Sequence, residues 1–305
     1  MSVKRMSWIF VVSLAVALLL VFAAAGCGDS DESTDDTTTG DTGSTLSGEL
    51  TLSGSTTVLP IAQEAADMFM EENPDVTVTV QGGGSSVGIS NVAEGVVDIG
   101  DASRGLKEDE GDLGLVDHEI ALDVITIIVN PDVPVNDLTV DRAKGIFTGE
   151  ITNWSEVGGP DAGITVVIRD EASGTREIFD GKVLGKDVMP VQGAIETNSN
   201  GIMRQTVSST PNSIGYISLG YLDSSVTPVK YEGVEASADN AVSGDYPLSR
   251  YLHMFTKGTA TGLAEEFIDF ILSDDFQDEV VSTEYIPMTE TSIHGSRVGG
   301  SSDRG

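Results

Sequence analysis

The sequence predicts an α/β fold with largely parallel sheets. Short β-branched segments alternate with segments whose apolar residues recur every three or four positions, as in strand–helix–strand units. The 305 residues suggest two domains of about 150 residues each. Hydrophobic residues make up 39% of the chain, which is enough to form packed cores.

The first half of the chain contains most of the predicted strands. Residues 76–80 alternate between valine and threonine, as a strand with one buried face does, and residues 124–129 are almost all β-branched, as in a strand buried on both faces. Apolar residues at helical spacing predict a helix that ends before Pro74. The predicted elements are strands at residues 49–52, 76–80, 96–100 and 124–129, and helices at residues 61–73, 87–94 and 140–147.

The second half repeats the alternation. Residues 165–169 form an apolar strand that leads into a glycine-containing loop and a helix from about residue 176. Residues 263–272 and 275–283 have helical spacing and predict two closing helices. The sequence shows no internal repeat of fixed period.

The N-terminus has the pattern of a secretory signal. Two basic residues precede an apolar run over residues 6–25, and Cys27 ends the sequence Ala-Ala-Gly-Cys, which resembles the lipobox of bacterial lipoproteins. We therefore expect residues 1–26 to be a signal peptide and Cys27 to be lipidated. The run is also long enough for an uncleaved helical anchor, which is the alternative. Either way, the remainder lies outside the cytoplasm, tethered to the cell membrane in the periplasm or at the cell surface.

Two segments have too few apolar residues to join a core. Residues 27–47 are rich in Asp, Ser, Thr and Gly, which predicts a flexible acidic linker after the lipidated cysteine. Residues 292–305 are small and polar, which predicts a disordered tail. The folded part is therefore expected to span residues 48–291.

Composition excludes several functions. The net charge of −33 argues against nucleic acid as a partner, because phosphate backbones are bound by Lys and Arg. The single cysteine excludes an intramolecular disulfide framework and a site with several cysteine ligands, and the three scattered histidines argue against a metal site. No metal or organic cofactor is indicated.

Three loops share one design. Each is rich in glycine, carries Ser or Thr, follows a predicted strand and opens a predicted helix; they are Ser53–Thr57, Gly82–Ser86 and Ala172–Thr175. A helix N-terminus offers unpaired N–H groups and a partial positive charge, and glycine lets a ligand approach the backbone closely. Such loops are suited to bind anions. Helix capping alone would explain any one of them, but three loops of the same type favour an anion site.

Arg169 lies just before the third loop. Its guanidinium group can form a bidentate contact with a tetrahedral oxyanion. The alternative is a salt bridge to Asp170 or Glu171 beside it.

Six segments together resemble one family. They are Ser53-Gly54-Ser55-Thr56-Thr57-Val58-Leu59-Pro60, Gly83-Gly84-Ser85-Ser86, Val97-Asp98-Ile99-Gly100, Ile146-Phe147-Thr148-Gly149-Glu150-Ile151-Thr152-Asn153-Trp154, Arg169-Asp170-Glu171-Ala172-Ser173-Gly174-Thr175 and Ile214-Gly215-Tyr216. In this order they resemble the PstS family, the phosphate-binding components of ABC-type phosphate importers. The resemblance covers nearly all of residues 48–288.

The resemblance implies a fold and a function. The fold would be that of type II periplasmic binding proteins, in which two α/β lobes joined by two hinge crossings close on a ligand in the cleft. Lobe 1 would comprise residues 48–123 and 234–291, and lobe 2 residues 124–233. The protein would be a monomer without enzymatic activity that captures inorganic phosphate and delivers it to an ABC permease.

The resemblance also implies the ligand contacts. The matching donors are Ser55, Thr56 and Thr57 of the first loop, Ser85 of the second, and Arg169, Ser173, Gly174 and Thr175 from the opposite lobe. Trp154 belongs to the family pattern, but we interpret it as a packing residue of the core or the cleft wall.

One position departs from the family. Well-known members carry a carboxylate here that accepts the proton which phosphate keeps at neutral pH, whereas this chain has Ser103 followed by Arg104. Ser103 or Arg104 would then contact the ligand directly, or Arg104 would pair with a surface carboxylate. Alternatively, Asp101 would serve as the proton acceptor. Selectivity between phosphate and sulfate stays open.

Three other functions compete with phosphate import. The same fold could bind sulfate, molybdate or tungstate, or the closed state could signal to a sensor. An extracellular serine hydrolase is disfavoured, because the chain has no Gly-x-Ser-x-Gly motif and no evident histidine base. The net charge argues against long-range attraction of an anion, so binding by dipoles and hydroxyl groups at contact distance should vary little with ionic strength.

Overall fold

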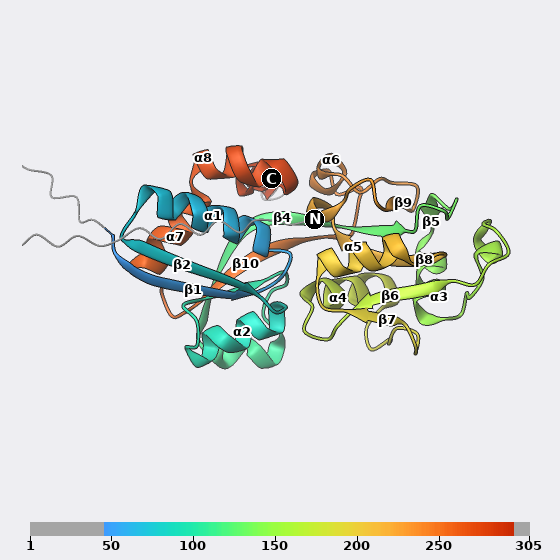
Figure 1. Ribbon diagram of the computed structural model, residues 1–305, viewed down its shortest axis with the longest axis horizontal. Coiled ribbons are helices and arrows are strands. Elements are labelled where there is room, and N and C mark those ends of the chain that lie inside the picture. Colours follow the sequence, from blue (N-terminus) through green and yellow to red (C-terminus); the bar gives the residue numbers. More distant parts are fainter. Residues whose placement is uncertain (1–45, 296–305) are drawn as a thin grey trace, which may run out of the picture. The chain divides into compact units, whose positions relative to one another are not determined.

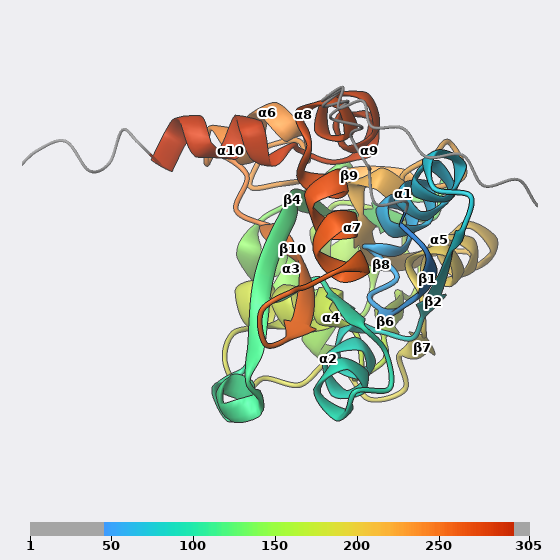
Figure 2. The ribbon, with the colours of Figure 1, turned by 90° about the vertical axis from the view of Figure 1, so that its left-hand side faces the viewer.

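A computed structural model describes residues 46–295 of the protein (Figures 1 and 2). The strands are β1 (Gly48–Gly54), β2 (Val76–Gly82), β3 (Ile99–Ala102), β4 (Leu115–Val129), β5 (Asp137–Leu138), β6 (Thr165–Arg169), β7 (Ile195–Thr197), β8 (Ser213–Ser218), β9 (Thr227–Tyr231) and β10 (Ser249–Lys257). The helices are α1 (Leu59–Glu72), α2 (Ser85–Glu94), α3 (Val140–Thr148), α4 (Gly174–Phe179), α5 (Asn200–Ser209), α6 (Ala238–Val242), α7 (Leu263–Leu272), α8 (Asp274–Phe276), α9 (Ser282–Glu284) and α10 (Met288–Gly295).

One set of strands forms lobe 1. The strand order is β2-β1-β3-β10-β4, in which β1 is parallel to β2 and β3 and β10 is antiparallel to β3 and β4. Met254 and Phe255 are neighbours on β10 and belong to different hydrophobic clusters, because successive side chains of a strand point to opposite faces. Helices α1 and α7 therefore cover one face of this sheet and α2 covers the other, as Figure 1 also shows.

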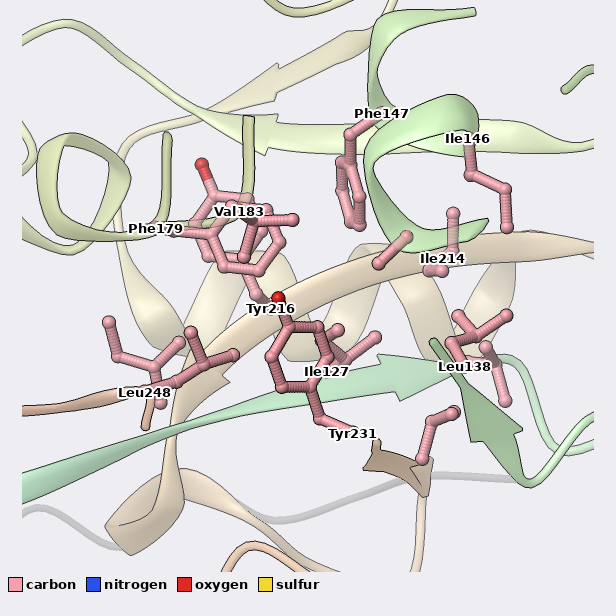
Figure 3. Close-up of a cluster of buried hydrophobic side chains, with 14 of the residues drawn as sticks. Ile127, Leu138, Ile146, Phe147, Phe179, Val183, Ile214, Tyr216, Tyr231 and Leu248 are labelled. Atoms are coloured by element: carbon pink, nitrogen blue, oxygen red, sulfur yellow. The ribbon is translucent and has the colours of Figure 1, made fainter. Parts of the chain in front are cut away.

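The remaining strands form lobe 2. Here β4 pairs antiparallel with β8 and β9, while β6 is parallel to β7 and β8. Ile127 contributes to a large cluster with α3 and α4, whereas Ile128 faces a smaller cluster with α5. Figure 3 shows the large cluster, in which the Tyr216 and Phe179 rings are stacked with their centroids 4.0 Å apart.

Strand β4 belongs to both lobes. Residues 115–124 pair with β10 of lobe 1, and residues 125–129 pair with β8 of lobe 2, so the chain crosses between the lobes without leaving the strand. Figure 2 shows β4 and β10 running side by side. The expectation of largely parallel sheets is therefore wrong for β4 and β10, whose pairings within the described residues are all antiparallel, because these strands carry the chain from lobe 1 to lobe 2 and back.

Several predicted elements agree closely with the structure. The strand at residues 165–169 and the helix at residues 263–272 coincide with β6 and α7. The strand predicted at residues 96–100 is displaced, because Gly95 adopts a left-handed φ of 72° after α2 and β3 starts only at Ile99. The helix predicted at residues 275–283 is divided into α8, a π-helical turn at Gln277–Val281, and α9.

The lobe boundaries stay a prediction. The expected first crossing near residue 123 lies within β4, where the pairing changes from β10 to β8. Tyr246 and Leu248 pack in the large cluster of lobe 2, so we propose that the return crossing lies at the start of β10 rather than near residue 234.

The termini extend beyond the described part. The predicted signal peptide, the predicted lipidation site Cys27 and most of the predicted linker lie outside the described residues. The predicted tail starts within α10, which continues to Gly295, and residues 296–305 lie outside the described range. Within residues 46–295, no helix has both the length and the apolar character needed to cross a bilayer.

Candidate functional site

The three glycine-rich loops meet between the lobes. The first two follow the parallel strands β1 and β2 and are joined by a hydrogen bond from Gly84 N to Gly54 O at 2.8 Å. The third follows β6 of lobe 2 and accepts a hydrogen bond from Ser86 N at Ala172 O, at 3.1 Å. Parallel strands present their carboxyl ends at one edge of a sheet, which brings the first two loops together, and the hydrogen bond from Ser86 N joins them to the third.

Glycine permits the closest approaches at this junction. A Cβ atom on Gly84, whose φ is +98°, would lie 2.7 Å from Ala172 O. A Cβ atom on Gly174 would lie 2.4 Å from Ser85 Oγ and 2.9 Å from Ser103 Oγ. Side chains at these two positions would hold the lobes apart.

The predicted hydroxyl donors are buried at the junction. Each of them is between 0 and 7% exposed; they are Ser55, Thr56, Thr57, Ser85, Ser173 and Thr175. Some also stabilise their own loops, since Ser173 accepts a hydrogen bond from Arg176 N as the N-cap of α4, and Ser55 accepts one from Thr57 N. The N–H groups of Gly174 and Thr175 begin α4 and have no acceptor within that helix.

Arg169 reaches from the end of β6 in lobe 2 to the first loop in lobe 1. It is 1% exposed, and its Nη2 donates to Thr56 Oγ1 at 3.3 Å and to Asn198 O at 3.2 Å. Its Nε and Nη1 are buried without a hydrogen-bond partner among the described residues. No ion pair joins it to Asp170 or Glu171 within residues 46–295, so the alternative interpretation of Arg169 as the partner of its neighbours is not supported.

Arg250 is a second buried arginine at the junction. It begins β10, and its Nη2 lies 2.8 Å from Asp123 Oδ2, 3.0 Å from Thr175 Oγ1 and 3.2 Å from Thr57 Oγ1. Its Nε and Nη1 also lack a partner in the described part of the chain. Arg250 was not predicted as a site residue from the sequence. An arginine in an apolar stretch of a very acidic chain was a weak signal that it has a buried role.

Neutral side chains complete the cluster. Asn200 Nδ2 donates to Thr57 Oγ1 at 2.9 Å, and the Asn200 Oδ1 atom accepts from Ser218 N at 3.2 Å. Tyr221 and Tyr285 donate their hydroxyl hydrogens to the carbonyl oxygens of Thr56 and Thr57, at 2.6 and 2.9 Å. No sequence motif marked these residues, because each comes from a different segment.

Electrostatics make this cluster suited to an anion. Burial lowers the pKa of Arg169, and the charge of Arg250 lowers it further, while burial also lowers the pKa of Arg250. Asp123 is the buried carboxylate that pairs with Arg250, so its charge does not balance both arginines. Buried guanidinium groups with unpaired N–H donors require a negative partner or water.

Asp101 and Ser103 lie next to the first and second loops. Ser103 N donates to Ser85 Oγ at 3.0 Å, and the two serine hydroxyl oxygens lie 3.2 Å apart. The backbone oxygen of Asp101 accepts from Ser55 N at 2.8 Å. Burial raises the pKa of Asp101 well above its ordinary value, and its Oδ1 has no partner among the described residues.

The guanidinium group of Arg104 forms ion pairs with two carboxylates. Both of its terminal nitrogens bond Glu110, at 2.6 and 2.8 Å, and Nε lies 2.8 Å from Glu177 Oε2 of lobe 2. Lys107 Nζ lies 3.1 Å from the same Glu177 oxygen. Burial alone would raise the pKa of Glu110, but hydrogen bonds and charge from Arg104 and Lys107 outweigh burial and lower it. We call Arg104, Lys107, Glu110 and Glu177 the charged latch, because it joins the lobes.

Two remaining expectations concern packing and metals. Trp154 is fully buried in the large cluster of lobe 2 and donates to Asn212 O at 3.0 Å, which confirms that it is a packing residue. Within residues 46–295, no group of three or more His, Cys, Asp or Glu side chains is arranged to hold a metal ion.

Comparison with known families gives a consistent result. A family model described as the PBP superfamily domain matches residues 39–275. The phosphate-binding protein PstS of Bacillus subtilis is 40% identical over 294 residues, which cover 95% of this chain and 97% of that protein. The phosphate-binding protein PstS of Borreliella burgdorferi is 32% identical over 242 residues, covering 76% and 87%.

Two solved structures have folds similar to that of this chain. A candidate phosphate ABC transporter substrate-binding protein from Clostridium perfringens, with bound phosphate, is 41% identical and has a TM-score of 0.77, covering 79% of this chain and all of that one. An ABC-type phosphate transport receptor from Vibrio cholerae is 36% identical with a TM-score of 0.66, covering 78% and 99%.

Proposed function

The chain belongs to the PstS family of phosphate-binding proteins, and from this premise we propose that it captures inorganic phosphate between its lobes and delivers it to an ABC permease. It acts as a solute-binding protein and not as an enzyme. Binding is stoichiometric and is accompanied by closure of the lobes.

The unpartnered guanidinium groups of Arg169 and Arg250 carry this proposal. Both side chains are buried, and both keep N–H groups without an acceptor among the described residues. Hydroxyl groups from both lobes surround them, with Thr57 and Thr175 only 3.2 Å apart. A tetrahedral oxyanion supplies the negative charge and the acceptor oxygens that these donors lack.

The proposed ligand contacts follow from this arrangement. Backbone N–H groups of the first loop and of α4 donate to the anion, together with hydroxyl groups of Ser55, Thr56, Ser85, Ser173 and Thr175. Ser103 acts indirectly, because its backbone N–H donates to Ser85 Oγ and orients that hydroxyl group. Arg104 contributes through the charged latch rather than by contact with the ligand, because its guanidinium group is engaged by Glu110 and Glu177.

Replacing Arg169 tests the site. We expect Arg169→Ala to weaken phosphate binding by about 1.5–3 kcal/mol, or more than tenfold, because a charged hydrogen bond to the anion is lost. Arg142→Ala is the matched control, since Arg142 is an exposed arginine on α3 of lobe 2. Calorimetric titration with phosphate measures both variants, and equal affinities would show that Arg169 only braces its loop.

Another oxyanion is the competing ligand. Ser103 stands where well-known members of the family carry a carboxylate, so another group must accept the phosphate proton if the site is to reject sulfate. We propose that Asp101 accepts the phosphate proton, as its buried Oδ1 atom is unpartnered. Titration with phosphate, sulfate and molybdate tests this choice, and preference for sulfate at neutral pH would contradict phosphate as the ligand.

The cellular arrangement is part of the proposal. We propose that the chain is a monomer outside the cytoplasm, anchored to the membrane through lipidated Cys27 after removal of residues 1–26. Metabolic labelling with a radioactive fatty acid tests the anchor, with Cys27→Ser as the unlabelled control. Deleting the protein and measuring phosphate uptake distinguishes import, which would fall, from a sensing role, which would leave uptake unchanged.

A further inference from the structure

Thr57 and Thr175 bring hydroxyl groups from opposite lobes to within 3.2 Å of each other. A hydroxyl group has one hydrogen to donate and two lone pairs that accept. The groups around the two oxygens therefore decide which threonine donates to the other. That direction in turn decides whether the cluster offers a hydrogen or a lone pair to a ligand.

The surroundings of Thr57 fix its direction. Asn200 Nδ2 lies 2.9 Å and Arg250 Nη2 lies 3.2 Å from Thr57 Oγ1. The Asn200 amide is oriented by Ser218 N, which donates to its Oδ1, and arginine has no acceptor atom. Arg250 Nη2 carries two hydrogens, so one is directed to Asp123 Oδ2 and the other is shared between Thr57 Oγ1 and Thr175 Oγ1. With Asn200 as the second donor, the lone pairs of Thr57 are occupied and its hydrogen is directed to Thr175.

The direction of Thr175 follows from that of Thr57. Thr175 Oγ1 accepts from Arg250 Nη2 at 3.0 Å and from Thr57. No other described residue forms a hydrogen bond with this hydroxyl group, so its hydrogen remains for a ligand bound between the lobes. A ligand oxygen beside Thr175 must then accept a hydrogen bond, and any proton that it carries must point away from Thr175.

We infer that Asn200 and Arg250 are positioning residues of the oxyanion site, which act through Thr57 to keep Thr175 a hydrogen-bond donor. The inference rests on the proposed function. It implies that hydrogenphosphate binds with its proton directed away from Thr175. Rejection of unprotonated anions such as sulfate then depends on groups elsewhere in the site.

Asn200→Asp tests the direction with little change in shape. The new carboxylate accepts where the amide donated, so Thr57 donates to it, Thr175 donates to Thr57, and a lone pair of Thr175 faces the ligand. Hydrogenphosphate can donate its own hydroxyl hydrogen to this lone pair, whereas sulfate has no hydrogen to donate. We expect phosphate affinity to fall about tenfold and sulfate affinity to fall about a further tenfold.

Gln205→Glu is the matched control for charge. Gln205 is exposed on the same helix, α5, and the substitution makes the same change from amide to carboxylate. Calorimetry with phosphate, and with sulfate by competition, compares both variants with the wild type. Equal losses of the two anions in Asn200→Asp would indicate charge repulsion alone and would overturn the inference.

A double-mutant cycle gives an independent test with variants that add no charge. If Asn200 acts through Thr57, Asn200→Ala weakens phosphate binding in the wild type but has little effect when Thr57 is already valine. Additive effects would overturn the inference. Failure of the wild type to bind either anion would instead refute the proposed function, so the two failures are distinguishable.

Discussion

Gly174 and Ser85 lie in opposite lobes, yet a Cβ atom on Gly174 would be only 2.4 Å from Ser85 Oγ. The first turn of α4 is therefore packed directly against the second glycine-rich loop. The same Cβ atom would lie 2.9 Å from Ser103 Oγ, so no small shift of one side chain relieves the contact. The closed arrangement of the lobes depends on glycine at this position.

Gly174→Ala should prevent full closure and weaken phosphate binding. Overpacking typically costs about 1–3 kcal/mol, so we expect a loss of roughly tenfold or more in affinity by calorimetry. Gly181→Ala is the control, because nothing lies within 4 Å of a Cβ atom placed there. Unchanged affinity in Gly174→Ala would show that the loops are farther apart in the bound state.

Replacing Arg250 should destabilise the protein even without ligand. Arg250→Met leaves Asp123 buried without its ionic partner, and such losses amount to about 3–5 kcal/mol. Lys230→Met removes an exposed ion pair with Glu235 and should cost less than about 1 kcal/mol. Urea unfolding measures both, and the additional Asp123→Asn change should restore part of the loss in Arg250→Met.

The charged latch should make a small contribution to closure. Glu177→Gln removes the ion pair with Arg104 of the opposite lobe, but Glu177 is 38% exposed, so we expect a loss of phosphate affinity below about fivefold. Glu196→Gln removes an ion pair with Arg176 inside lobe 2 and should leave affinity unchanged. Equal effects of the two substitutions in calorimetry would contradict a role in closure.

Asp101 should make the stability of the ligand-free protein depend on pH. Its pKa is raised by burial, so the folded chain retains a proton that the unfolded chain has released. The free energy of unfolding therefore falls as the pH rises from the ordinary carboxyl pKa to the raised value. Asp123 and Asp180, whose pKa values burial also raises, contribute in the same direction. Asp101→Asn should therefore reduce this fall in thermal unfolding, whereas Asp109→Asn, at an exposed position, should leave it unchanged.

Phosphate affinity should vary little with salt. The proposed donors act at contact distance in a buried site, where screening is weak, although the chain carries a net charge of −33. We expect the dissociation constant to change less than about threefold between about 0.05 and 0.5 M potassium chloride. A steep dependence would show that distant charges control binding.

The fold was predictable where local signals were strong. β6 and α7 were located from apolar periodicity alone. The first part of β4 and the strand β10 were missed because Asp117, His118 and His253 interrupt the apolar pattern. These strands are stabilised by pairing with each other across a long sequence separation, which no local pattern records.

The site was predictable only in its loops. Glycine and hydroxyl residues mark anion-binding turns within a few positions, so the loops that carry Thr56, Ser85 and Thr175 were predicted from the sequence, and the structure buries these residues between the lobes. Arg250 and Asn200 reach the same cluster from a strand and a helix that carry no such motif. Their roles depend on hydrogen bonds between distant segments, and these appear only when the chain is folded.

Calorimetric titration of the wild-type protein with phosphate and with sulfate at neutral pH tests the central claim most directly. We predict one phosphate bound per chain, with sulfate competing only weakly. Failure to bind phosphate, or tighter binding of sulfate, would contradict the account.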